Sequence, residues 1–137
     1  MGNGEKREEY VEMINKLNLN DRVHLLGARK DVPNIMKTAD LFVLSSHFEG
    51  FGLVAVEAMA SGLPVIGSNV AGLTDIISGA GRLFDQGNAD QLSEIIMELT
   101  ENPDTCASMI DAGNTKSSLY SIREFVDGHI DLYKSIL

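Results

Sequence analysis

Two short apolar segments with a helical pattern between them most constrain how this chain can fold. Residues Leu41 to Leu44 are continuously apolar, which is typical of a strand in the middle of a parallel sheet. Phe51 to Ala60 reads FGLVAVEAMA and predicts a helix, and Val65 to Gly67 predicts the next strand. A strand, a helix and a second strand in this order indicate a parallel α/β sheet.

The same alternation of helical and extended patterns continues along the chain. Two further strands are predicted at Val23 to Leu26 and at Arg82 to Phe84. Asn88 and Gln91 have the spacing of a capping box at a helix start, and Asp31 is expected to cap an earlier helix. The predicted helices are Glu5 to Leu17, Val32 to Thr38, Gly72 to Ile77, Asn88 to Leu99, Pro103 to Ser117 and Ile122 to Ile136.

Glu57 is the one charged residue in the predicted helix Phe51 to Ala60. Because every other residue there is apolar or small, this helix is expected to be buried on all sides. A buried carboxylate without a partner is costly, so Glu57 should meet a hydrogen-bond donor, a cation or the hydroxyls of a ligand. A structural pair with a backbone or lysine donor satisfies this requirement as well as a ligand does.

A glycine-rich loop precedes this helix. Gly50 and Gly52 flank Phe51, which lets the backbone approach a ligand, and free amides in the first helical turn favour an anion. Ser61 and Gly62 are expected to end the helix. Ligands of doubly wound sheets bind at the carboxyl ends of the strands. The candidate rim therefore consists of Gly27 to Asp31, Ser45 to Gly52 and Ser68 to Thr74.

Glu49 and Glu57 are separated by seven residues within EGFGLVAVEAMASGLPVI. This run resembles the E-x7-E signature of retaining, nucleotide-sugar-dependent glycosyltransferases of family 4, the glycosyl transferases group 1, which have the GT-B fold. DRVHLLGARKDVPNIMKTADLFVLSS resembles the segment before the signature in that family, and SNVAGLTDII with GAGRLFDQGNADQLSEII resembles the segments after it. The resemblance covers roughly residues 2 to 135.

The resemblance implies a Rossmann-like, three-layer α/β/α parallel sheet, as the C-terminal half of a GT-B fold lacking its first strand. Residues 1–137 would form a single, partial nucleotide-sugar-binding domain without the N-terminal acceptor domain. The implied activity is transfer of a sugar from a nucleoside diphosphate sugar to an acceptor with retention, in polysaccharide or glycoconjugate synthesis. No cofactor is implied. A catalytic metal is not expected either, because no His, Cys and Asp cluster has metal-ligand spacing.

The resemblance also implies roles for individual residues. Glu49 would be the catalytic residue, at the donor sugar near its hydroxyls and the reacting carbon, and Glu57 would accept hydrogen bonds from the ribose hydroxyls. The amides of Phe51 to Leu53 would hold the distal phosphate, while Ala28 and Arg29 would lie against the base. The predicted donor-binding residues are therefore Ala28, Arg29, Gly50, Phe51, Gly52, Leu53 and Glu57.

Other residues near the predicted rim have more than one interpretation. Arg29 and Lys30 could touch a phosphate or remain solvated, and His47 could orient the sugar or act as an acid or base. Asp75 stands where the family usually has glutamate, which shortens this donor-site side chain. Cys106 is expected to be a structural helix residue. His24 and His129 are also expected to be structural.

Composition narrows the classes of partner. The net charge is −9, and residues 38 to 137 carry four Lys and Arg against fourteen Asp and Glu, which disfavours nucleic acid. One cysteine excludes an intramolecular disulfide and favours a reducing, cytoplasmic location. No apolar run has the length of a membrane span, and MGNGEKREEY does not resemble a signal peptide. Membrane contact is expected only through the absent half.

The chain is expected to be a truncated donor half that binds nucleotide weakly and does not turn over by itself. Exposed sheet edge and cleft wall should favour self-association. Two other functions remain open: a noncatalytic nucleotide-binding or scaffold module, and a related nucleotide-sugar epimerase with acid–base residues facing the sugar. The sequence does not identify the donor base, the sugar, the acceptor or the linkage.

Overall fold

The computed structural model describes residues 6–120. The chain divides into two compact units, Met1–Val32 and Pro33–Leu137. The predicted helix Ile122 to Ile136 and His129 lie outside the described residues.

The first unit contains helix α1 (Arg7–Lys16), which confirms the helix predicted at Glu5 to Leu17. The helix ends where Asn18 adopts a positive φ of 54°, a conformation that asparagine tolerates better than most residues. Ile14 is half-buried, whereas Tyr10 and Met13, which lie on the same side of the helix, are exposed.

The strand predicted at Val23 to Leu26 is wrong. Within residues 6–120, the sheet is formed only by strands between Phe42 and Phe84, and this earlier segment pairs with none of them. Val23 and Leu26 are 40% and 46% exposed, so their apolar side chains are not enclosed either. A strand needs a hydrogen-bonded neighbour, which an apolar pattern alone cannot supply. His24 was expected to lie in this strand and therefore does not lie in one.

The second unit is built around three parallel strands in the order β1-β2-β3, which are β1 (Phe42–Leu44), β2 (Val65–Ser68) and β3 (Arg82–Phe84). Phe42 pairs with Val65, and Ile66 pairs with Arg82. The middle strand of the described sheet is β2, which is buried along its whole length. The prediction that Leu41 to Leu44 lies in the middle is wrong, because β1 forms an edge. An apolar strand sequence indicates that both faces of the strand are at least partly buried. It does not indicate whether both edges of the strand are hydrogen-bonded to neighbouring strands.

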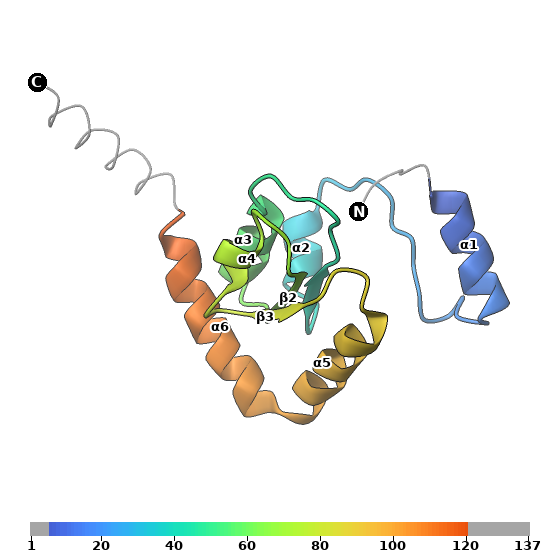
Figure 1. The fold of residues 1–137 in the computed structure, drawn as a ribbon. Coiled ribbons are helices and arrows are strands. Elements are labelled where there is room, and N and C mark those ends of the chain that lie inside the picture. The colour runs from blue at the N-terminus through green and yellow to red at the C-terminus, as the bar shows by residue number, and fades with distance from the viewer. Residues whose placement is uncertain (1–5, 121–137) are drawn as a thin grey trace, which may run out of the picture. The chain divides into compact units, whose positions relative to one another are not determined.

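Helices connect and follow these strands: α2 (Val32–Met36), α3 (Leu53–Ala60), α4 (Thr74–Ile77), α5 (Ala89–Glu101) and α6 (Pro103–Ser118). Figure 1 shows α3 and α4 on one side of the strands and α5 on the other. Gly67 faces α4 so closely that a Cβ there would overlap Ile77. The described second unit thus has helices on both faces of a parallel sheet, which confirms the predicted α/β architecture.

The opposite face of the sheet packs on α5 and the start of α6. Ile66 and Phe84 form a core cluster with Leu99 and Met109. Successive residues of a strand point to opposite faces, so Ile66 faces this cluster while Gly67 faces α4. Helix α5 presents an apolar stripe to this cluster, and its members belong to the cluster or border it: Leu92, Ile95, Ile96 and Leu99.

The helix ends follow local sequence signals. Asn88 caps α5 by accepting a hydrogen bond from the Gln91 amide at 3.1 Å. The Gln91 side chain accepts from the Asp85 amide instead of completing the reciprocal capping box. At the end of α3, the Gly62 amide donates to Met59 and the Leu63 amide donates to Ala58, which is a Schellman motif with Gly62 at a φ of 78°.

Candidate functional site

The loops after β1 and β2 lie against each other at the carboxyl ends of the strands. The hydroxyl of Ser68 donates a 2.6 Å hydrogen bond to the carbonyl of Ser46. A Cβ on Gly72 would overlap the carbonyl oxygen of Glu49. The structure therefore brings together two of the three predicted rim segments, Ser45 to Gly52 and Ser68 to Thr74. The third, Gly27 to Asp31, belongs to the first unit.

Ser68 is a buried polar residue that the sequence did not single out. Its side chain is 1% exposed, and its hydroxyl holds the Glu49 loop to the end of β2. Buried polar groups require partners, so a serine at the end of a fully apolar strand was an available signal.

Gly52 and Gly72 allow the close approach of the two loops. Gly52 has a φ of 68° and precedes α3, and Gly72 has a φ of 82°. A Cβ on Gly52 would lie 3.0 Å from a methyl group of Leu73. Both positions require positive φ and small volume, which explains glycine at each.

Glu49 is half-buried in this loop. Its Oε2 accepts a hydrogen bond from Ser46 Oγ at 3.2 Å. Ser46 therefore orients the predicted catalytic carboxylate. A carboxylate has two oxygens that can accept several hydrogen bonds, so Glu49 retains capacity for hydroxyl donors.

Glu57 lies on the open face of α3, so the expectation of a helix buried on all sides is wrong. Ala55, Val56, Ala58 and Met59 are buried, whereas Leu53 is 59% exposed and Glu57 and Ala60 are exposed on the same side. In residues 6–120, no hydrogen bond or ion pair reaches the Glu57 carboxylate. The apolar composition of α3 predicted burial, but it did not show that one face of the helix is open within the described residues.

The start of α3 offers unsatisfied backbone donors. The helix has no side-chain cap, and within the described residues the amides of Phe51, Gly52 and Leu53 have no acceptor. Gly50 is exposed and has open space around its Cβ position. Amides directed outward at a helix start favour a bound anion. This geometry matches the predicted phosphate site, although the role of each residue remains a prediction.

His47 is held by a glutamine from the turn after β3. Gln86 Nε2 lies 2.6 Å from His47 Nδ1 and donates a 3.0 Å hydrogen bond to the His47 carbonyl. Both side chains are exposed, and the contact links the Glu49 loop to a third strand end. The sequence offered no signal for this pair.

Ala28 and Arg29 lie in the first unit, and both are exposed. Two nitrogens of the Arg29 guanidinium donate to the Asp31 carboxylate at 2.8 and 2.7 Å. These hydrogen bonds lower the pKa of Asp31 and raise the pKa of Arg29. The sequence suggested that Asp31 caps α2. Its carboxylate instead accepts hydrogen bonds from Arg29 and does not cap the helix.

Two other candidates have clear structural surroundings. Cys106 is half-buried beside the core cluster, and its thiol donates to the Leu99 carbonyl at 3.3 Å, which fits the expected structural role. Asp75 is exposed, and its carbonyl accepts a hydrogen bond from the Lys116 ammonium at 2.7 Å.

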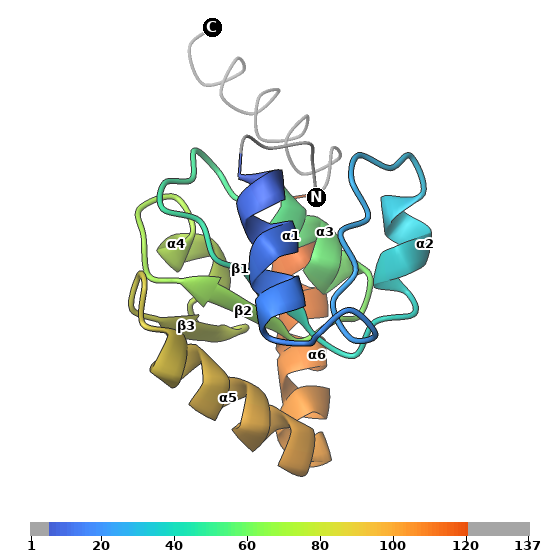
Figure 2. The same cartoon turned by 90° about the vertical axis from the view of Figure 1, so that its right-hand side faces the viewer.

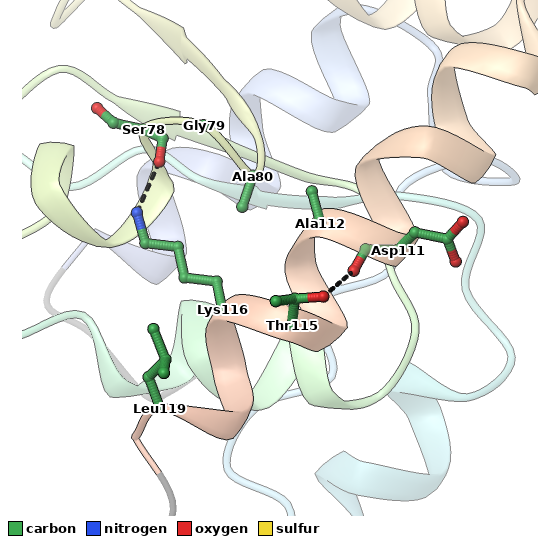
Figure 3. A pocket seen from close by; sticks show the side chains of 8 residues that line it. All are labelled: Ser78, Gly79, Ala80, Asp111, Ala112, Thr115, Lys116 and Leu119. Carbon is green, nitrogen blue, oxygen red and sulfur yellow. Dashed lines mark hydrogen bonds between the residues drawn. The ribbon is translucent and has the colours of Figure 1, made fainter.

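A separate cavity of about 480 Å³ lies between the end of α4 and α6. Figure 3 shows Lys116 reaching across it to the Ser78 carbonyl. None of the predicted site residues lines this cavity. Within the part of the chain that is described, no group of three or more His, Cys, Asp and Glu is arranged to hold a metal ion.

Comparison with known proteins agrees with the fold. Residues 1–116 match the family model described as glycosyl transferases group 1, and the chain belongs to this family. It is 31% identical over 140 residues to an uncharacterized glycosyltransferase of Methanocaldococcus jannaschii, covering 99% of this chain and 40% of that protein. It is 34% identical to an Escherichia coli UDP-Gal:alpha-D-GlcNAc-diphosphoundecaprenol alpha-1,3-galactosyltransferase, covering 85% of this chain and 31% of that protein.

The solved structures include HepE of Anabaena in complex with UDP-glucose. This chain superposes on it with a TM-score of 0.86 at 29% identity, covering 98% of this chain and 38% of HepE. The predicted Rossmann-like α/β fold and the resemblance to the donor-binding domain of GT-B glycosyltransferases are confirmed. The chain spans less than half the length of these relatives.

Proposed function

We propose that this chain is the donor-binding part of a retaining glycosyltransferase that uses a nucleoside diphosphate sugar. The observation that carries the proposal is the run of amides at Phe51, Gly52 and Leu53 that have no acceptor within the described residues, which lies in the sequence between Glu49 and Glu57. Amides suit a diphosphate, and carboxylates suit the hydroxyls of two sugar rings.

The phosphate end of the site stabilises the leaving group. As the glycosyl bond breaks, negative charge develops on the diphosphate, and the amides at the start of α3, which have no acceptor within the described residues, would donate to it. Gly52 and Gly72 hold this backbone in place before the donor binds. Rate enhancement would come mainly from this preorganisation and from positioning of the reactants.

The two carboxylates take different sugars. Glu57, on the open face of α3, accepts hydrogen bonds from the ribose diol, and Glu49 accepts from the transferred sugar while Ser46 orients it. Because Glu57 is assigned to the ribose, the pair does not work as the acid and nucleophile of a glycosidase. The departing phosphate assists the acceptor on the same face, which retains the configuration. The proposed mechanism requires no metal.

Uridine diphosphate sugars are the first donors to test. HepE was solved with UDP-glucose and the Escherichia coli relative is named for UDP-Gal, so both proteins support a uridine donor. A second domain would bind the acceptor and make any membrane contact. The single cysteine supports a cytoplasmic site of action.

Calorimetric titration with UDP, GDP and ADP tests the proposal. The chain should bind one diphosphate, and Glu57→Ala should weaken that binding about 10- to 100-fold by removing a charged acceptor. The same variant should lose the preference for UDP over 2′,3′-dideoxy-UDP. Glu94→Ala, which changes an exposed glutamate on α5, is the matched control.

Two results would reject the proposal. Absence of binding to all three nucleotides would favour the scaffold alternative. Equal affinities of wild-type and Glu57→Ala protein would remove the ribose assignment.

Self-association through the edge of β1 is a separate expectation, which light scattering at high protein concentration tests directly.

A further inference from the structure

Phe51 contacts an aromatic residue from the far end of the described chain. Its ring packs edge-to-face against Tyr120, with ring centroids 5.7 Å apart and an interplanar angle of 79°. Phe51 is 50% exposed and Tyr120 is 37% exposed, so the contact lies at the surface of the second unit. Edge-to-face pairs place the positive edge of one ring on the negative face of the other, which favours one relative orientation.

Phe51 has the only side chain between two glycines in the proposed phosphate loop. Gly50 has open space around it, and Gly52 has a positive φ, so neither residue anchors the loop by side-chain packing. Packing against the Phe51 ring can therefore restrain the adjacent amides. Glu49 fixes the other end of the loop through Ser46 and Gly72.

Tyr120 follows a helix that is firmly mounted on the second unit. Figures 1 and 2 show α6 packed beside α3. Gly113 lies against Met59, where a Cβ would come within 3.3 Å of the Met59 side chain. Phe51 precedes Met59 in the sequence, whereas their partners Tyr120 and Gly113 follow in the reverse order. Helix α6 therefore lies antiparallel to α3.

Lys116 adds a second attachment between these two contacts. Its ammonium donates to the carbonyls of Asp75 and Ser78 at 2.7 and 2.6 Å. The contacts at Gly113 and Lys116 fix α6 in rotation and along its axis. The position of Tyr120 is thereby set by the scaffold rather than by the loop that it touches.

We propose that Tyr120 is a positioning residue for the donor diphosphate. By packing against Phe51 it holds the amides of Phe51, Gly52 and Leu53 in the orientation that the distal phosphate requires. Tyr120 does not itself touch the donor. This inference rests on the proposed function, because it assigns the same amides to the diphosphate.

Parallel titrations of UDP and UMP test the inference, since UMP lacks the distal phosphate. Tyr120→Leu should weaken UDP binding about three- to tenfold, the range expected for loss of an aromatic pair, and should leave UMP binding unchanged. Tyr120→Phe retains the ring and should restore the wild-type affinity for UDP. Hydrogen exchange should show that UDP protects residues 51–53 less in Tyr120→Leu than in the wild type.

The outcomes separate this inference from the proposed function. If the wild-type chain binds neither nucleotide, both fail. If the wild type binds UDP and Tyr120→Leu binds it equally well, or weakens UDP and UMP by the same factor, only the inference fails. Should Tyr120→Leu not fold, Tyr120→Met fills similar space without a rigid ring and must show the same selective loss for UDP.

Discussion

The α-carbon of Gly72 faces the main-chain carbonyl of Glu49, leaving no room for a side chain between them. The loop after β2 thereby supports the backbone of the loop that carries the predicted catalytic carboxylate. Gly72 also has a φ of 82°, so an L side chain would be strained there even without the contact.

Gly72→Ala should therefore lower the free energy of unfolding by about 2–5 kcal/mol, combining the cost of positive φ with the cost of steric overlap. It should also weaken UDP binding by displacing the Glu49 loop. Urea denaturation and calorimetry measure the two effects. Gly79→Ala is the control, since Gly79 has a φ of 79° and open space, and it should cost about 1–2 kcal/mol. Equal losses for the two variants would show that the contact with Glu49 has no energetic role.

Ser68→Ala should destabilise the second unit because it removes a buried donor. The Ser68 hydroxyl binds the Ser46 carbonyl at 2.6 Å, and without it that carbonyl loses its partner at the edge of the core. The expected loss is about 1–3 kcal/mol. Thermal unfolding followed by circular dichroism gives the value.

Ser61→Ala is the matched control for Ser68→Ala. The Ser61 hydroxyl bonds to the Glu57 carbonyl at 2.8 Å, within one helical turn and near solvent, so its removal should change stability by about 0.5 kcal/mol or less. A Ser68→Ala protein as stable as Ser61→Ala would show that the loop after β1 does not depend on this hydrogen bond.

Local signals were sufficient to predict β3, α5 and α6. The strand Arg82–Phe84 has the predicted bounds, and α5 begins after the predicted cap at Asn88. Pro103 opens α6, also as predicted, because proline at a first helical turn loses no hydrogen bond. Each of these elements is specified by residues within a few positions of its own ends.

Features that depend on distant residues were predicted less well. Val23 to Leu26 has a strand pattern without a paired neighbour, and Leu41 to Leu44 has a central pattern but an edge position. The site shows the same division. The glycine loop and its free amides follow from the sequence, whereas the support of Ser68 and the contact of Tyr120 come from segments that only folding brings near the loop.

Lys116→Met should destabilise the contact between α6 and α4. The ammonium bonds to the carbonyls of Asp75 and Ser78 at the end of α4, where a cation also interacts favourably with the helix dipole. Partial exposure reduces the benefit, so the expected loss is about 1–2 kcal/mol. Chemical denaturation measures it, with Lys37→Met, a change at an exposed lysine, as the control. Lys116 would have no capping role if both substitutions had the same effect.

Arg29→Gln should raise the pKa of Asp31 toward its ordinary value of 3.8, because the guanidinium hydrogen bonds are the main cause of the lowered pKa. A carboxylate with a lowered pKa in the folded state stabilises the fold above its unfolded pKa. That stabilisation disappears as the pH falls through the folded pKa, so the difference in stability between wild type and variant should be present above the unfolded pKa and should vanish at acidic pH. Carboxyl NMR titration of Asp31 measures the change directly. Lys30→Gln removes an adjacent cation without removing these hydrogen bonds, and should leave the Asp31 titration where it is in the wild type. An identical Asp31 titration in wild type and Arg29→Gln would mean that the ion pair does not persist in solution.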